Sequence, residues 1–105
     1  MVTQAQAILN EHMEENEFQQ QLRDTALLYN WLYYHTHDSR RCDLGFLDTV
    51  LLKSNRLIFA ELKVKHNTMS SSQKTWFNTL STCEGIEVYL WYPKDWDTIV
   101  SILSK

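Results

Sequence analysis

The chain has 105 residues and a net charge of −3, with 44% hydrophobic and 12% aromatic residues. This length favours a single domain spanning residues 1–105, and the apolar content excludes a disordered chain because it can supply one core. No apolar run approaches the ~20 residues that cross a bilayer, and the N-terminus lacks the features of a secretory signal, so we expect a cytoplasmic protein with no membrane partner.

The N-terminal third of the chain is expected to form a helix followed by a strand. Residues 1–12 carry weak patterning, and we interpret them as a loose N-terminal extension. Apolar residues from Phe18 to Tyr29 then recur at helical spacing, which predicts a helix over residues 13–30. Aromatic and β-favouring residues predict a short strand over 31–35.

A hairpin and a crossover helix are predicted next. Strands are expected over 46–52 and 57–65, and the turn-forming residues that join them read KSNR. A serine-rich loop can cap the following helix, which we place over 73–82 with Trp76 on its apolar face.

The C-terminal part predicts a strand and a closing helix. The residues IEVYLWY indicate a strand over 86–92, buried on both faces, and Pro93 ends it before a helix over 95–103. A strand–helix–strand crossover normally joins parallel strands. The order αβββαβα therefore predicts an α/β fold with a mixed four-stranded sheet flanked by helices. We place Trp76, Trp91 and Trp96 in its core and leave the place of Trp31 open.

Three charged residues stand within the predicted hairpin. Side chains two apart in a strand share a face, so Glu61 and Lys63 point the same way while Leu62 faces the core. The neighbouring antiparallel strand is about 5 Å away, so Asp48 can meet Glu61 across the ladder. Two adjacent carboxylates can hold Mg²⁺, and a lysine beside them can stabilise charge on a phosphate. The same residues also suit a plain cross-strand salt bridge.

The charge distribution bears on the partner. Residues 40–74 hold seven Lys or Arg against three Asp or Glu, a net of +4, while the remainder carries −7. A basic segment around two acids suits a phosphate-rich partner, although a solvated surface with ordinary scatter fits as well.

The wider pattern is more specific than these three residues. The segments are GFLDTVLL, LIFAELKVK, MSSSQKTWFNTL and GIEVYLWYPKDWDTI, preceded by EENEFQQQLRDTALLYNWLYYHTHDSRR. Together they resemble the VRR-NUC family of the PD-(D/E)xK nuclease superfamily over roughly residues 14–100, most closely its small stand-alone phage-type members. The chain departs from the family at Leu47, where a proline is usual, and SSSQ also lacks a common proline.

The resemblance implies a restriction-endonuclease-like fold and a nuclease that uses Mg²⁺ or Mn²⁺ on DNA. It implies that Asp48 and Glu61 bind the metal, with the backbone carbonyl of Leu62 and with Glu15 from the first helix. Lys63 and Gln73 match the family's other catalytic positions, and Ser70 opens the motif that contains Gln73.

Further residues are expected to contact DNA. The segment HTHDSRR contributes His35, His37, Arg40 and Arg41, which are also plausible as ordinary residues of a solvated loop. The remaining members of the predicted DNA-binding set, beside Ser70, are Lys65 and Lys74.

Two functions follow from this reading. The first is a metal-dependent DNA endonuclease, selective for branched DNA such as a four-way junction, acting in the cytoplasm of a host cell if it is phage-encoded. Cutting a symmetric junction needs two sites, so we expect a homodimer. The second is a catalytically silent module of the same fold that binds DNA or a protein partner.

Overall fold

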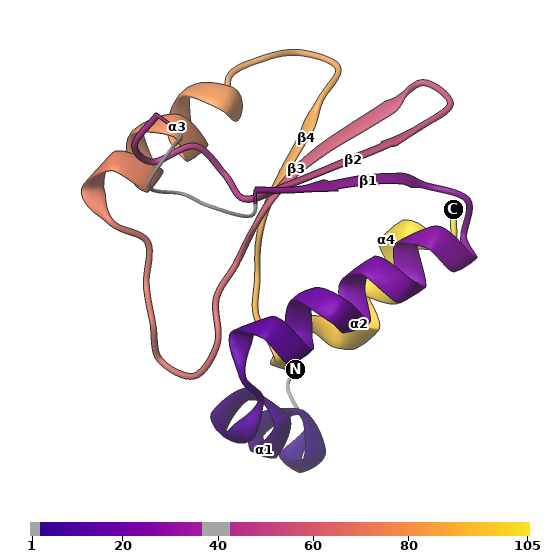
Figure 1. Ribbon diagram of the computed structural model, residues 1–105, viewed down its shortest axis with the longest axis vertical. Coiled ribbons are helices and arrows are strands. Elements are labelled where there is room, and N and C mark those ends of the chain that lie inside the picture. The colour runs from indigo at the N-terminus through magenta and orange to yellow at the C-terminus, as the bar shows by residue number, and fades with distance from the viewer. Residues whose placement is uncertain (1–2, 37–42) are drawn as a thin grey trace.

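The computed structural model describes residues 3–36 and 43–105, with Leu9 described by its backbone alone. Its elements are α1 (Gln4–His12), α2 (Glu15–Leu28), β1 (Leu32–His35), β2 (Thr49–Lys53), β3 (Arg56–Leu62), α3 (Ser71–Leu80), β4 (Glu87–Trp91), the 3₁₀ turn η2 (Pro93–Asp95) and α4 (Trp96–Leu103). The predicted α/β class with a mixed four-stranded sheet is confirmed (Figure 1).

The strands follow one another in the order β1-β2-β3-β4. The first two pairings are antiparallel, and β3 pairs with β4 in parallel, as the crossover through α3 predicts. Thr49 on β2 lies opposite Ala60 on β3, so the next pair toward the sheet end is Asp48 and Glu61. The register therefore puts the two predicted metal ligands across from each other.

One side of the sheet holds the core. Helices α2 and α4 lie side by side against it, while α3 stands apart on the other side (Figure 1). Phe18, Leu22 and Ala26 recur every four residues on α2 and are fully buried, because this spacing forms one helix face. They pack with residues of the sheet and of α4 in a single cluster. In contrast, α3 has no buried residue.

Helix α1 was not predicted by the weak patterning of residues 1–12. It is held by tertiary contacts rather than by an apolar stripe. The side-chain amide of Asn10 donates to the backbone oxygen of Lys65 at 2.9 Å, and the backbone amide of Lys65 donates to the backbone oxygen of Asn10 at 2.9 Å. Gln6 adds a 3.0 Å hydrogen bond to Asp97 near the start of α4. Such distant partners leave no signal in the local sequence.

Two expectations about burial were wrong. Strand β4 is only partly buried before Trp91, because it lies at the edge of the sheet and has a neighbour on one side. Trp76 is 37% exposed, since α3 does not pack closely on the sheet. Trp91 is buried and Trp96 packs against the core, as predicted. Trp31, whose place the sequence left open, is 1% exposed.

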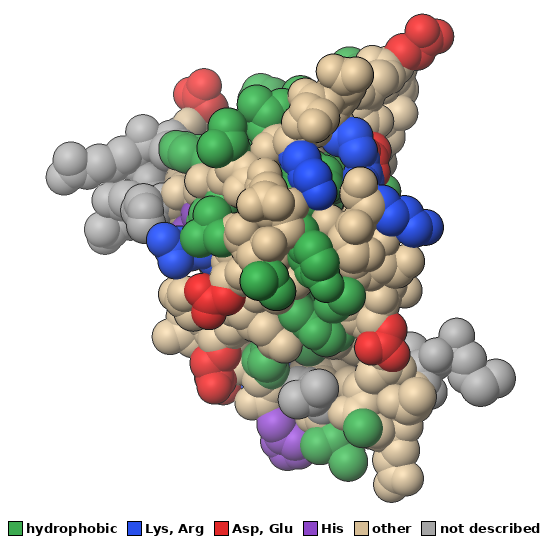
Figure 2. Space-filling view, turned by 90° about the vertical axis from the view of Figure 1, so that its right-hand side faces the viewer, with side chains coloured by type: hydrophobic (Ala, Val, Ile, Leu, Met, Phe, Trp, Pro, Cys, Tyr) green, Lys and Arg blue, Asp and Glu red, His purple; other side chains and the backbone are tan. Residues whose placement is uncertain are grey.

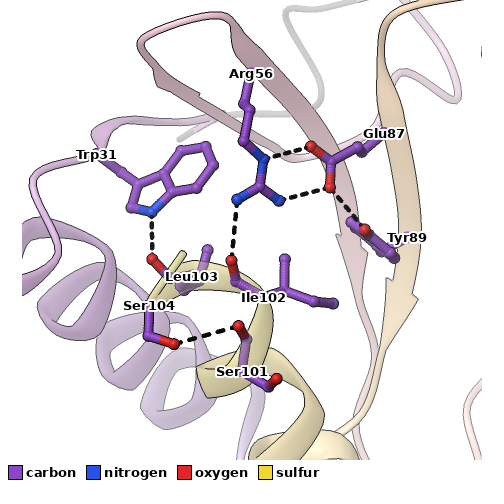
Figure 3. Close-up of polar contacts among 8 residues, drawn as sticks. All are labelled: Trp31, Arg56, Glu87, Tyr89, Ser101, Ile102, Leu103 and Ser104. Carbon is purple, nitrogen blue, oxygen red and sulfur yellow. Dashed lines mark hydrogen bonds and ion pairs between the residues drawn. The ribbon is translucent and has the colours of Figure 1, made fainter.

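Strand β3 is tied to the end of α4 by Arg56. Its guanidinium makes two hydrogen bonds to Glu87, at 2.8 and 2.7 Å, and a third of 3.1 Å to the Ile102 carbonyl (Figure 3). It also lies over the Trp31 ring, whose Nε1 donates to the Leu103 carbonyl at 2.9 Å. These donors satisfy carbonyls that a helix C-terminus leaves open. The network fixes α4 onto the sheet.

Apolar side chains also reach the surface. Leu32 on β1 lies opposite Leu52 on β2, and they are 68% and 42% exposed. Figure 2 shows hydrophobic side chains running down the middle of the face that it draws. Among residues 3–36 and 43–105, none of the helices combines the length and apolar character that crossing a bilayer requires.

Candidate functional site

Asp48 and Glu61 meet at one end of the sheet beside a cavity of about 510 Å³. Asp48 directly precedes β2, and its backbone amide lies 3.4 Å from Oε1 of Glu61 on β3. Glu61 is 2% exposed, which is rare for a carboxylate unless partners stabilise it. The structure thus brings together the two acids that the sequence paired.

The second oxygen of Glu61 receives two donors. Lys63 Nζ lies 3.3 Å from Oε2, and Gln73 Nε2 donates to the same oxygen at 2.9 Å. The strand alternation puts Lys63 on the side of Glu61, while Leu62 is fully buried on the other side. The predicted salt bridge and the predicted catalytic arrangement therefore share one geometry.

Gln73 reaches Glu61 because it sits in the first turn of α3. Ser70 caps this helix: its hydroxyl accepts the Gln73 amide proton at 3.2 Å, and Gln73 Oε1 accepts the Ser70 amide proton at 2.9 Å. This reciprocal capping box leaves the Gln73 Nε2 group for the carboxylate. The start of α3 is thereby tied to the site.

Burial and neighbouring negative charge raise the pKa of both carboxylates. Burial raises the pKa of Glu61 from 4.5 to about 7, with the Asp48 charge adding to this and Lys63 opposing it. Burial likewise raises the pKa of Asp48 from 3.8 to about 6, which the Thr49 hydroxyl partly offsets and the Glu15 charge reinforces. Perturbed carboxylates in a cavity are typical of functional sites, although structural networks produce them too.

Asp48 is held by two residues that the sequence reading missed. The Thr49 hydroxyl donates to Asp48 Oδ1 at 3.1 Å, and Gln19 Nε2 donates to the Thr49 hydroxyl at 3.0 Å. Gln19 belongs to the buried face of α2, next to Phe18, and is 8% exposed. A polar residue on that apolar face was the sequence signal that could have identified it.

The donor set fits a hard divalent cation. The backbone N–H of Lys63 donates to the backbone oxygen of Trp91 on β4. The carbonyl of Leu62 belongs to the same peptide group and points the opposite way, toward the strand side on which Asp48 lies. Two carboxylates and a backbone carbonyl are oxygen ligands of the kind that Mg²⁺ takes, completed by waters. Glu15 lines the same cavity but is exposed, and no cluster of three or more His, Cys, Asp or Glu side chains suited to a metal occurs in residues 3–36 and 43–105.

The segment before Asp48 forms a wall of the cavity and packs on α3. Gly45 has φ of +88°, and a Cβ there would lie 2.6 Å from backbone atoms of Ser72. Phe46 meets the Trp76 ring edge-on at 5.1 Å, and Trp76 Nε1 donates to the Leu44 carbonyl at 3.1 Å. Exposed Trp76 therefore fixes this wall rather than filling the core.

The predicted DNA contacts divide into three groups. His35 and Ser70 line the cavity, and His35 Nδ1 lies 3.1 Å from the Asp48 carbonyl oxygen. Lys65 lies beyond the end of β3, has a φ of +58° and pairs with Glu14 at 2.9 Å, while Lys74 is exposed on α3. The remaining three, His37, Arg40 and Arg41, lie outside the described residues.

Comparisons of the chain with protein-family models, curated proteins and solved structures find no significant match. The family resemblance therefore remains a prediction that rests on the sequence motifs alone.

Proposed function

We propose that this protein is a metal-dependent DNA nuclease of the VRR-NUC type, with a restriction-endonuclease-like arrangement of its sheet and helices. The observation that supports this most is the pairing of half-buried Asp48 with buried Glu61, with Lys63 directly beside Glu61. A carboxylate pair of this kind repels itself unless a cation lies between or it keeps a proton. Stability alone does not explain why both acids share one cavity.

In this proposal Asp48, Glu61 and the Leu62 carbonyl hold Mg²⁺ or Mn²⁺, with Glu15 reaching in from α2. The cation would supply positive charge that polarises the phosphoryl oxygen. The Lys63 ammonium lies on the cavity side of β3 and can offset negative charge that develops on a phosphate. Gln73 keeps Glu61 oriented through its 2.9 Å hydrogen bond.

The proposed substrate is branched or duplex DNA, and a four-way junction is the preferred candidate. The described cavity is small for a DNA duplex, so a second copy of the chain would supply the remaining contacts and the second cut. The resemblance to phage-type members extends the proposal to a homodimer acting in a host cytoplasm.

A silent nuclease-fold module that binds DNA or a protein is the second candidate. One observation favours it: Lys63 and Glu61 form an ion pair, so the charge of each is already neutralised by the other without a metal or a substrate. A module of this kind would bind DNA with a salt-dependent affinity and cut nothing.

Cleavage of labelled four-way junction, flap and linear duplex DNA tests the proposal, with Mg²⁺, Mn²⁺ or EDTA present. We expect metal-dependent cutting that Asp48→Asn and Glu61→Ala abolish, while the exposed control Glu84→Ala cuts as the wild type does. Folded wild-type protein that cuts none of the three DNAs with either metal would overturn the nuclease proposal, and retained DNA binding would then favour the silent module.

A further inference from the structure

We infer that Gln19 and Thr49 are positioning residues that orient the Asp48 carboxylate toward the metal. The inference rests on the proposed function, because it assigns a role in holding the same ion. Its basis is a chain of hydrogen bonds from the core to the site: Gln19 Nε2 to the Thr49 hydroxyl at 3.0 Å, and that hydroxyl to Asp48 Oδ1 at 3.1 Å. Thr49 is fully buried and Gln19 is 8% exposed.

The direction of this chain is set by the protons available. A hydroxyl carries a single proton, and Thr49 directs it to the Asp48 carboxylate, which is an acceptor when ionised. Thr49 must then accept from Gln19, so Gln19 turns its amide nitrogen inward. The same nitrogen also donates to the Tyr33 hydroxyl. With both N–H groups used, the Gln19 side chain is fixed in one orientation.

This orientation has a cost that packing does not explain. Oε1 of Gln19 is buried and receives no donor from residues 3–36 and 43–105. A buried acceptor that receives no donor destabilises the folded state. The neighbouring positions on this face of α2 are Phe18, Leu22 and Ala26, so an apolar side chain would suit the core. A polar residue that the core does not require is best explained by the hydrogen bond that it sends to Thr49.

The consequence for the site is a carboxylate with one oxygen committed. Thr49 donates to Oδ1 of Asp48, and Asp48 lines the same cavity as Glu61. Groups that orient a ligand in this way commonly change metal affinity by about 10–100-fold when they are removed. The effect is expected on binding of the ion, with little change in the fold.

Direct Mn²⁺ binding tests the inference by isothermal titration calorimetry on the full chain. Thr49→Val keeps the shape of the side chain and removes the hydroxyl, and Gln19→Met keeps its length and removes the amide. We expect Thr49→Val to weaken Mn²⁺ about 10-fold or more and Gln19→Met about 3-fold or more. Thr49→Ser, which restores the hydroxyl, should bind Mn²⁺ within about 3-fold of the wild type.

Two further readings separate the possible outcomes. Urea denaturation identifies variants that are folded, and cleavage by Thr49→Val should recover as the Mn²⁺ concentration is raised. Folded Thr49→Val and Gln19→Met that both bind Mn²⁺ like the wild type would overturn the inference and leave the nuclease proposal standing. A wild-type protein that binds no Mn²⁺ would overturn the metal site itself, and the inference with it.

Discussion

The stability of the metal-free protein should fall as the pH rises, because of Glu61. Its pKa is raised from 4.5 to about 7 by burial and by the neighbouring Asp48 charge. Between these two pH values the folded protein holds a proton that the unfolded chain releases. The free energy of unfolding therefore decreases with rising pH across this window, which is the sign required when the native state binds more protons.

The size of the effect follows from the shift. One pKa unit corresponds to about 1.4 kcal/mol, so the full contribution of Glu61 is ~3 kcal/mol. Part of it is already lost at pH 5, above the ordinary value of 4.5, so the change from pH 5 to pH 8 is ~2.5 kcal/mol. Glu61→Gln cannot ionise and should lack this slope.

The assay is urea denaturation in EDTA at pH 5, 6, 7 and 8, comparing the wild type with Glu61→Gln. We expect the variant to gain about 2.5 kcal/mol relative to the wild type over this range. The exposed Glu84→Gln serves as the matched control and should run parallel to the wild type at every pH. A wild type whose difference from Glu61→Gln stays constant, or changes in the opposite direction, would refute the reasoning.

Three further predictions concern other parts of the molecule. Arg56→Ala should lower the free energy of unfolding by about 1–3 kcal/mol, since it removes a bidentate ion pair and a helix cap. The control Arg23→Ala removes only an exposed 3.8 Å ion pair with Asp24, so its free energy of unfolding should stay within about 0.5 kcal/mol of the wild type. Gly45→Ala should lower the free energy of unfolding by at least about 2 kcal/mol in thermal or urea denaturation, because the added Cβ meets the backbone of Ser72 at 2.6 Å. Gly85→Ala has open space around it and should lower the free energy of unfolding by about 1 kcal/mol, so equal losses would contradict the steric argument. Lys63→Met should reduce DNA cleavage by about 100-fold or more while calorimetric Mn²⁺ binding persists, and unchanged cleavage would remove the lysine from the proposed chemistry.

Local pattern was enough to predict most of the fold. The spacing of Phe18, Leu22 and Ala26 predicted α2, and the turn KSNR between two apolar segments predicted the β2–β3 hairpin. The crossover rule gave the parallel pairing of β3 with β4. Strand ends were less accurate: the strand predicted to Lys65 stops at Leu62, which pairs with Trp91, the last residue of β4.

Features set by distant contacts could not be predicted. Helix α1 depends on hydrogen bonds between Asn10 and Lys65, which are far apart in the sequence. At the site, the side-by-side placement of Asp48 and Glu61 followed from strand geometry, but the hydrogen bond from Gln19 to Thr49 joins two elements whose relative rotation the sequence does not specify. Side-chain networks of this kind depend on packing angles, and residue spacing alone does not determine those.

The capping box of α3 restricts which residue can stand at position 73, depending on whether the site is in use. Gln73 serves the helix through its carbonyl oxygen and Glu61 through its amide nitrogen. Glutamate would cap the helix equally well, but it would put a third negative charge against the carboxylate pair. Helix stability therefore permits two residues here, and the site permits one. Related chains that lack the carboxylate pair should therefore tolerate glutamate at this position, while chains that keep the pair should not.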